Sequence, residues 1–187
     1  MSGRCWRWSR DRRFVVLTAE ECMGQFCVHV SKDNLIFAAG HFVSYNGGRV
    51  EPLHGHNYRL SVTVEGPVEE NAYVFNFVTL KRMMKRIADE LDHRMLLPRN
   101  NPIIQVEPQG DGGVVVRVAE RWYRFPGEDV VVLDIPNTTA EMLAQYLCSR
   151  FVAELALLGD AGHLTAIEVT VEETFGQEAV YRETLGA

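Results

Sequence analysis

The sequence is short of cysteine, and it lacks both a long apolar run and an excess of basic charge. The spacing of its four cysteines, Cys5, Cys22, Cys27 and Cys148, is not that of paired metal ligands. No apolar run reaches the roughly 18 residues that a membrane-spanning helix needs. We therefore expect no membrane association and a reducing, cytoplasmic location.

The charge balance argues against a nucleic-acid partner. Lysine and arginine total 19 of the 187 residues, aspartate and glutamate total 25, and the net charge is −6. Nucleic-acid binding needs clustered basic side chains that neutralise phosphates. Because 47% of the residues are hydrophobic and there is no low-complexity tract, we expect one globular domain that acts on a small molecule.

The first 25 residues differ in composition from the rest of the chain. They are rich in arginine, with Arg4, Arg7, Arg10, Arg12 and Arg13. The apolar stretch at 14–17 is shorter than the hydrophobic region of a signal peptide, and no small-residue cleavage pattern follows it. The sequence predicts a disordered tail over 1–25 and a single domain over 26–187. A second hypothesis is that translation starts at Met23.

Three of the six histidines lie close together in the sequence, at the ends of two alternating apolar runs. Side chains two apart in a strand share a face, so His54 and His56 point the same way, together with Tyr58. His41 continues the apolar face of the run that precedes it. Two adjacent strands could therefore bring three imidazoles together.

Three imidazoles suit a zinc site of the catalytic kind, in which the fourth coordination position stays open. A His-x-His pair alone is more typical of surface or core histidines. The additional histidine, about a dozen residues upstream, favours metal binding instead. We therefore expect a metal at His41, His54 and His56.

The remaining pattern predicts an α+β domain. Apolar residues over 80–91 repeat with the helical period, and a second helix is expected over 138–159, because its first residues, TTAE, have the form of a capping box. β-Branched and aromatic residues over 112–135 predict an inserted hairpin or small sheet between the helices. This order predicts an antiparallel sheet with both helices on one face. The expected strands are 26–40, 54–65, 165–173 and 179–183.

One closing strand carries a carboxylate on its apolar face. Ile167, Val169 and Val171 alternate on that face, and Glu173 is the next residue on it. A buried, unpaired charge costs several kcal/mol, so such a side chain usually meets a ligand or a cation. Alternatively, the strand ends there and Glu173 is solvated.

Over residues 26–185 the chain resembles the family of 6-pyruvoyl-tetrahydropterin synthase and 6-carboxy-tetrahydropterin synthase. The resemblance implies a tunnelling fold, ββααββ, whose subunits assemble as trimers or hexamers with active sites between subunits. It also implies 7,8-dihydroneopterin triphosphate as substrate and Zn²⁺ on the three histidines, where zinc would act as a Lewis acid. The matching segments are FAAGH at 37–41, HGHNY at 54–58, VFNF at 74–77, LDH at 91–93, TTAE at 138–141 and EET at 172–174.

The resemblance assigns roles to further residues. Glu173 matches the carboxylate that anchors the pterin ring, and Asp92 and His93 match a pair in which the carboxylate orients the imidazole for proton transfer. A cationic His93 at the helix end is the alternative interpretation of that pair. Thr139 and Glu141 fall in a pterin-contacting stretch, which the capping box explains equally well.

One departure from the family concerns the base. The family's proton-abstracting cysteine would stand at Val50 or Gly48, neither of which can accept a proton, and the nearest candidate is Glu51. Glu-x-x-His-Gly-His resembles the variant that forms 6-hydroxymethyl-7,8-dihydropterin, of the folate route. The default expectation is a lyase that forms 6-carboxy-5,6,7,8-tetrahydropterin for queuosine. The 6-hydroxymethyl product is the alternative, followed by 6-pyruvoyl-tetrahydropterin and by a non-catalytic pterin-binding oligomer.

Overall fold

A computed structural model describes residues 5–8, 14–17, 26–159 and 161–186. Its centre is a six-stranded sheet with the order β11-β7-β3-β6-β12-β13. Neighbouring strands from β3 to β13 are antiparallel, whereas β7 pairs parallel with both β3 and β11. These strands are β3 (Phe26–His41), β6 (His54–Gly66), β7 (Arg94–Pro98), β11 (Val130–Leu133), β12 (Ala166–Thr174) and β13 (Gln177–Thr184).

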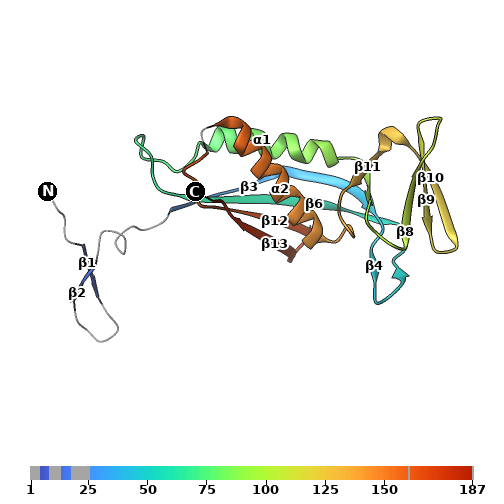
Figure 1. Ribbon diagram of the computed structural model, residues 1–187, viewed down its shortest axis with the longest axis horizontal. Coiled ribbons are helices and arrows are strands. Elements are labelled where there is room, and N and C mark those ends of the chain that lie inside the picture. The colour runs from blue at the N-terminus through green and yellow to red at the C-terminus, as the bar shows by residue number, and fades with distance from the viewer. Residues whose placement is uncertain (1–4, 9–13, 18–25, 160, 187) are drawn as a thin grey trace.

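Two helices, α1 (Phe77–Leu91) and α2 (Ala140–Leu158), run along the same face of this sheet (Figure 1). The helical period brings the apolar side chains of α1 onto the sheet, where Leu80, Met84 and Ile87 are fully buried. Alternation along β6 places Tyr58 and Leu60 in the same core. The predicted α+β class and the four predicted strands and two helices are confirmed, with boundaries within three residues.

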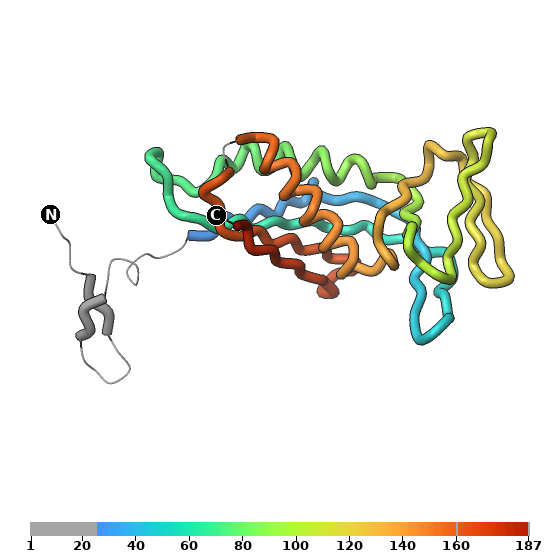
Figure 2. The backbone as a smooth tube through the Cα atoms, in the orientation of Figure 1, coloured from blue at the N-terminus to red at the C-terminus, as the bar shows by residue number. Residues whose placement is uncertain are grey.

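The inserted segment is larger than the predicted hairpin at 112–135. It forms a three-stranded antiparallel sheet with the order β10-β9-β8, at one end of the domain (Figure 2). A second core, which includes Phe42, Met95, Leu97 and Val116, joins it to the main sheet. Residues 130–133 belong to the main sheet instead. The inserted strands are β8 (Ile104–Pro108), β9 (Gly113–Val118) and β10 (Arg121–Pro126), followed by the 3-10 turn η1 (Gly127–Asp129).

The predicted capping box of the second helix is wrong by one residue. The N-cap of α2 is Thr139, whose hydroxyl accepts a hydrogen bond from the amide of Met142. Thr138 instead donates its hydroxyl proton to the carbonyl of Phe42, at 2.8 Å. This contact ties the start of α2 to the end of β3.

Two short strand pairs complete the described chain. β4 (Ser44–Tyr45) and β5 (Arg49–Val50) form a hairpin just beyond β3. β1 (Cys5–Trp8) pairs antiparallel with β2 (Phe14–Leu17), and the other residues of the predicted tail lie outside the described residues. Within the described ranges, neither helix has the length and apolar character needed to cross a membrane.

Candidate active site and metal centre

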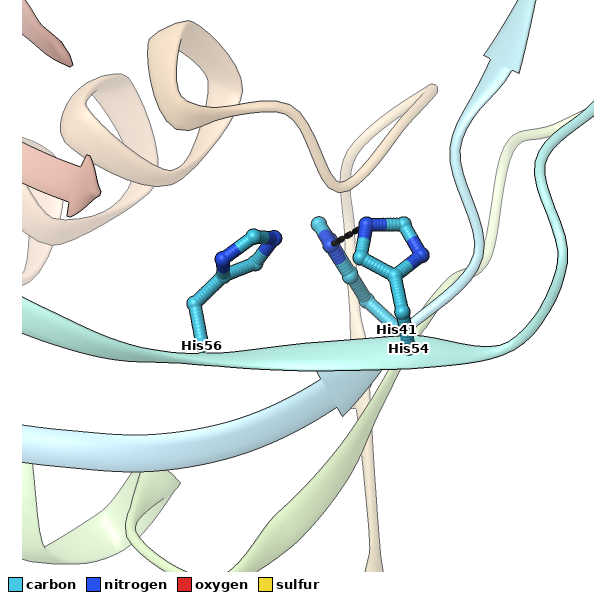
Figure 3. Close-up of side chains that lie close together, drawn as sticks. All are labelled: His41, His54 and His56. Carbon is cyan, nitrogen blue, oxygen red and sulfur yellow. Dashed lines mark hydrogen bonds between the residues drawn. The ribbon is translucent and has the colours of Figure 1, made fainter.

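The three predicted metal ligands meet where β3 ends and β6 begins. The antiparallel register pairs His41 with His54 and Ala39 with His56, so the three imidazoles lie on the helix side of the sheet. They converge beneath the segment that leads into α2 (Figure 3). One nitrogen from each ring lies within 4.8 Å of the other two. The predicted clustering of the three histidines is therefore present in the structure.

Two of these rings are oriented by backbone carbonyls. Nδ1 of His41 donates to the carbonyl of Thr138 at 2.8 Å, and Nδ1 of His54 donates to the carbonyl of Pro52 at 2.8 Å. Such a bond fixes the tautomer of a neutral imidazole and leaves Nε2 with its lone pair. The two Nε2 atoms face each other at 3.1 Å. Two nitrogens bound to one tetrahedral zinc lie about 3.3 Å apart, so this arrangement fits a metal ion.

Burial keeps His41 neutral. Its side chain is fully buried, and burial lowers its pKa to about 4, with a smaller contribution from the neighbouring His54 and His56 and some opposition from the Thr138 hydrogen bond. A neutral imidazole can offer a lone pair to a cation without first losing a proton. At pH 7 His41 is therefore ready to bind metal.

Glu173 lies beside the histidines, as its position on the apolar face predicts. Its Oε1 is 3.7 Å from Nε2 of His56 and 3.8 Å from Nε2 of His41. The buried hydroxyl of Tyr58 donates to the same oxygen at 3.4 Å. Burial and the neighbouring carboxylate raise the pKa of Tyr58, which keeps this donor protonated. Alternation places Tyr58 on the histidine face, but no role for it was predicted from the sequence.

Glu51 adds a second carboxylate, on the loop before β6. Its Oε2 lies 3.5 Å from Nε2 of His54. Glu51 also lines a cavity of about 320 Å³ together with His54, Thr139, Glu141 and Glu173. Five residues for which metal, base or substrate roles are predicted thus line one cavity.

The predicted contact between Asp92 and His93 is present, but the pair lies outside the cavity that Glu51 lines. Asp92 ends α1 and accepts the amide of Ala38 at 2.8 Å, while its other oxygen lies 3.0 Å from Nδ1 of His93. Although partial burial opposes it, the Ala38 amide and His93 lower the pKa of Asp92. The His93 side chain is 83% exposed and faces a separate cavity of about 730 Å³ that also touches His54 and His56. Within one chain, the pair therefore does not line the cavity that Glu51 and Glu173 share.

The arrangement defines a class of protein. Three convergent imidazoles can hold a divalent cation, and adjacent carboxylates can accept protons or bind a polar ring. His54 and the carboxylates of Glu51 and Glu173 line a cavity at one end of an α+β sheet. The fold and the site are those of a candidate metalloenzyme for a small polar substrate.

The sequence pattern of the family described as 6-pyruvoyl tetrahydropterin synthase matches residues 30–184, so the chain belongs to this family. A Methanocaldococcus jannaschii protein, assigned provisionally as a 6-carboxy-5,6,7,8-tetrahydropterin synthase, is 35% identical over 152 residues, which are 81% of this chain and 91% of that protein. The predicted family membership is confirmed.

Solved structures agree with this assignment. The 6-pyruvoyl tetrahydropterin synthase of Plasmodium falciparum is 30% identical, with a TM-score of 0.79 over 86% of this chain and 99% of that one. A Plasmodium vivax 6-pyruvoyltetrahydropterin synthase, in which a catalytic glutamate is replaced by alanine, is 25% identical. Its TM-score is 0.80 over 87% of this chain and 100% of that one. The predicted tunnelling fold is confirmed.

Proposed function

We propose that this chain is a zinc-dependent lyase that converts 7,8-dihydroneopterin triphosphate to a 6-substituted pterin. His41, His54 and His56 would hold the metal, Glu51 would be the base and Glu173 the pterin anchor. The observation that carries this proposal is the position of the Glu51 carboxylate, 3.5 Å from Nε2 of His54 in the cavity that Glu173 also lines. Base, metal ligands and anchor are then within reach of one small substrate.

Each residue type suits its proposed task. When bound, zinc would act as a Lewis acid that makes a nearby substrate hydroxyl more acidic. Glu51 would accept the proton, and Glu173 would receive two hydrogen bonds from the amine and ring nitrogen of the pterin. Thr139 and Glu141 form the cavity wall at the first turn of α2, where they would contact the ring.

The identity of the base bears on the product. A glutamate is a much weaker base than a thiolate, with an ordinary pKa of about 4.3 against about 8.5. It therefore suits removal of a proton from an acidified hydroxyl, whereas removal from carbon favours the stronger base. Cleavage of the carbon–carbon bond next to that hydroxyl would release the outer part of the side chain as an aldehyde. The carbon that stays on the ring would take up a proton and become a hydroxymethyl group, with no change of its oxidation state to carboxyl. Glu51 thus favours 6-hydroxymethyl-7,8-dihydropterin, and the catalytic glutamate of the Plasmodium vivax relative supports a glutamate in this role.

The second candidate product is 6-carboxy-5,6,7,8-tetrahydropterin, the default expectation from the sequence. It is supported by the name of the Methanocaldococcus jannaschii relative, which this chain matches over 91% of that protein's length. In this case the chain would serve the queuosine route. The two products differ in mass and separate in one assay.

We also propose a cytoplasmic homo-oligomer, a trimer or hexamer. The exposed Asp92–His93 pair lies outside the cavity of its own chain. A neighbouring copy could present this pair to the site, which would supply an imidazole in addition to that of His54, the histidine among the described lining residues of the cavity. In a non-catalytic pterin-binding oligomer, the other class of function, the same surfaces would assemble without turnover.

The test is to incubate the zinc-loaded protein with 7,8-dihydroneopterin triphosphate and to identify products by mass spectrometry. A 6-hydroxymethyl or 6-carboxy pterin, lost in Glu51→Gln and retained in Glu70→Gln on the exposed loop before α1, would support the lyase. Tight substrate binding without product, unchanged in Glu51→Gln, would favour the non-catalytic oligomer.

A further inference from the structure

A hydrogen-bond network that the proposed reaction does not use lies behind His41. It joins three segments that are far apart in the sequence: the loop before β8, the hairpin that follows β3, and the segment before α2. Its members are Asn101, Ser44, Asn137 and Thr138. The network ends on the carbonyl that accepts the Nδ1 proton of His41.

Thr138 is the member that contacts His41. It is fully buried, its hydroxyl donates to the carbonyl of Phe42 at 2.8 Å, and its own carbonyl accepts from His41 at 2.8 Å. Because Phe42 follows His41 directly, the two bonds clamp the end of β3 to the segment before α2. The orientation of the Thr138 peptide therefore determines the orientation of the imidazole.

Asn137 holds the preceding peptide, which carries the amide of Thr138. Its Oδ1 accepts the amides of Ser44 and Thr138, at 3.2 and 3.1 Å, and its Nδ2 donates to the carbonyl of Ser44 at 2.8 Å. This pair of bonds to one backbone residue resembles the pairing of two strands. Asn137 thereby sets the distance between the hairpin after β3 and the segment before α2.

Asn101 anchors the network to the inserted sheet. Its Nδ2 donates to the Ser44 hydroxyl at 2.8 Å and to the Pro136 carbonyl at 2.7 Å, and its Oδ1 accepts the amides of Ile103 and Ile104. These four bonds use the full capacity of an amide side chain. Asn101 is 8% exposed, and a buried polar group satisfied in this way has one well-defined orientation.

We infer that Asn137, supported by Ser44 and Asn101, is a positioning residue for the metal ligand His41. The inference rests on the proposed metal site and extends it: the inserted sheet stiffens the segment that orients one ligand. Partners behind a ligating histidine commonly change metal affinity by 10–100-fold when they are removed. Thr139, two residues after Asn137, lines the substrate cavity, so the same segment couples the metal ligand to the cavity wall.

The test measures metal binding rather than turnover. Zinc affinity is determined by competition with a chelator, and the visible spectrum of the cobalt-substituted protein reports coordination geometry. Asn137→Ala should weaken zinc binding about 10–100-fold and alter the cobalt spectrum. Ser44→Ala removes only one acceptor from the network and should weaken binding about two- to fivefold.

The matched control is Asn100→Ala. Asn100 is the neighbour of Asn101 but is exposed and donates to Asp134, outside the network. This variant should bind zinc as the wild type does. Wild-type affinity and an unchanged spectrum in Asn137→Ala would overturn the inference, and if that variant does not fold, wild-type affinity in Ser44→Ala would overturn it. A wild-type protein that binds no zinc would instead overturn the proposed function on which the inference rests.

Discussion

The glycine between two metal ligands provides a sharp test of the site geometry. Gly55 separates His54 from His56 on β6 and pairs with Gly40 on β3. A Cβ atom at Gly55 would lie 2.6 Å from the Ala39 carbonyl oxygen and 3.2 Å from Cα of Gly40. Both contacts are to backbone, so no side chain can move aside. Gly55→Ala therefore forces β3 and β6 apart between the histidines.

The size of this displacement follows from the contact. A carbon–oxygen approach is comfortable from about 3.3 Å, so the strands must separate locally by about 0.7 Å. Metal–ligand distances tolerate only about 0.2 Å. We expect Gly55→Ala to lose at least about tenfold in zinc affinity. Overpacking of this kind costs about 1–3 kcal/mol, which for a chain of this size lowers the melting temperature by about 2–12 °C.

The assay combines chelator competition for zinc with thermal unfolding of the metal-free protein. Gly110→Ala is the matched control, because a Cβ at Gly110 would have no neighbour within 4 Å. The control should keep wild-type affinity and stability. If Gly55→Ala matched the control in both measurements, the close approach of the two strands would not determine the ligand geometry, and the reasoning would be wrong.

Three further predictions concern individual side chains. Glu51→Gln should retain zinc but lower kcat by about 10²–10⁴-fold in a product assay, because it removes the base and leaves the histidines unchanged; an unchanged kcat would exclude Glu51 as the base. Glu173→Gln should weaken substrate binding by a larger factor than it weakens zinc binding, because Glu173 is the proposed pterin anchor and not a metal ligand. Calorimetric titration with the substrate and with zinc measures both affinities. In the metal-free protein, lowering the pH from 6.5 to 4 should cost about 3 kcal/mol of unfolding free energy, because unfolded His41 takes up a proton below 6.5 while the buried ring resists until about pH 4. Urea unfolding across this range should show the loss, and His41→Gln should reduce it.

The parts of the site that share one strand could be predicted from the sequence. Alternation in a strand has a fixed period of two, so the common face of His54, His56 and Tyr58 follows from their spacing. Glu173 follows from the same argument along β12. His41 meets His54 and His56 because of the register in which β3 pairs with β6. The sequence suggests that the two strands are adjacent but does not determine that register.

Contacts between distant segments could not be predicted in this way. The TTAE pattern predicts a capping box at Thr138 because a local pattern contains no information about distant partners. In the structure the Thr138 hydroxyl donates to the carbonyl of Phe42, 96 residues away. The sequence pattern does not predict β8, which is short and carries the exposed Gln105. It also does not predict that Val130–Leu133 joins the main sheet through parallel pairing with β7. The placement of His93 away from the Glu51 cavity also depends on tertiary structure, because the sequence motif does not determine which cavity the His93 side chain faces.

The most direct test of the central claim is the zinc stoichiometry of the wild type and of His54→Ala, measured by metal analysis after dialysis against a weak chelator. His54 is only partly buried, so its removal should leave the fold intact. The account predicts one zinc ion per chain in the wild type and little retained zinc in the variant, with unchanged secondary structure in both. A wild type without bound metal, or equal zinc content in the two proteins, would contradict it.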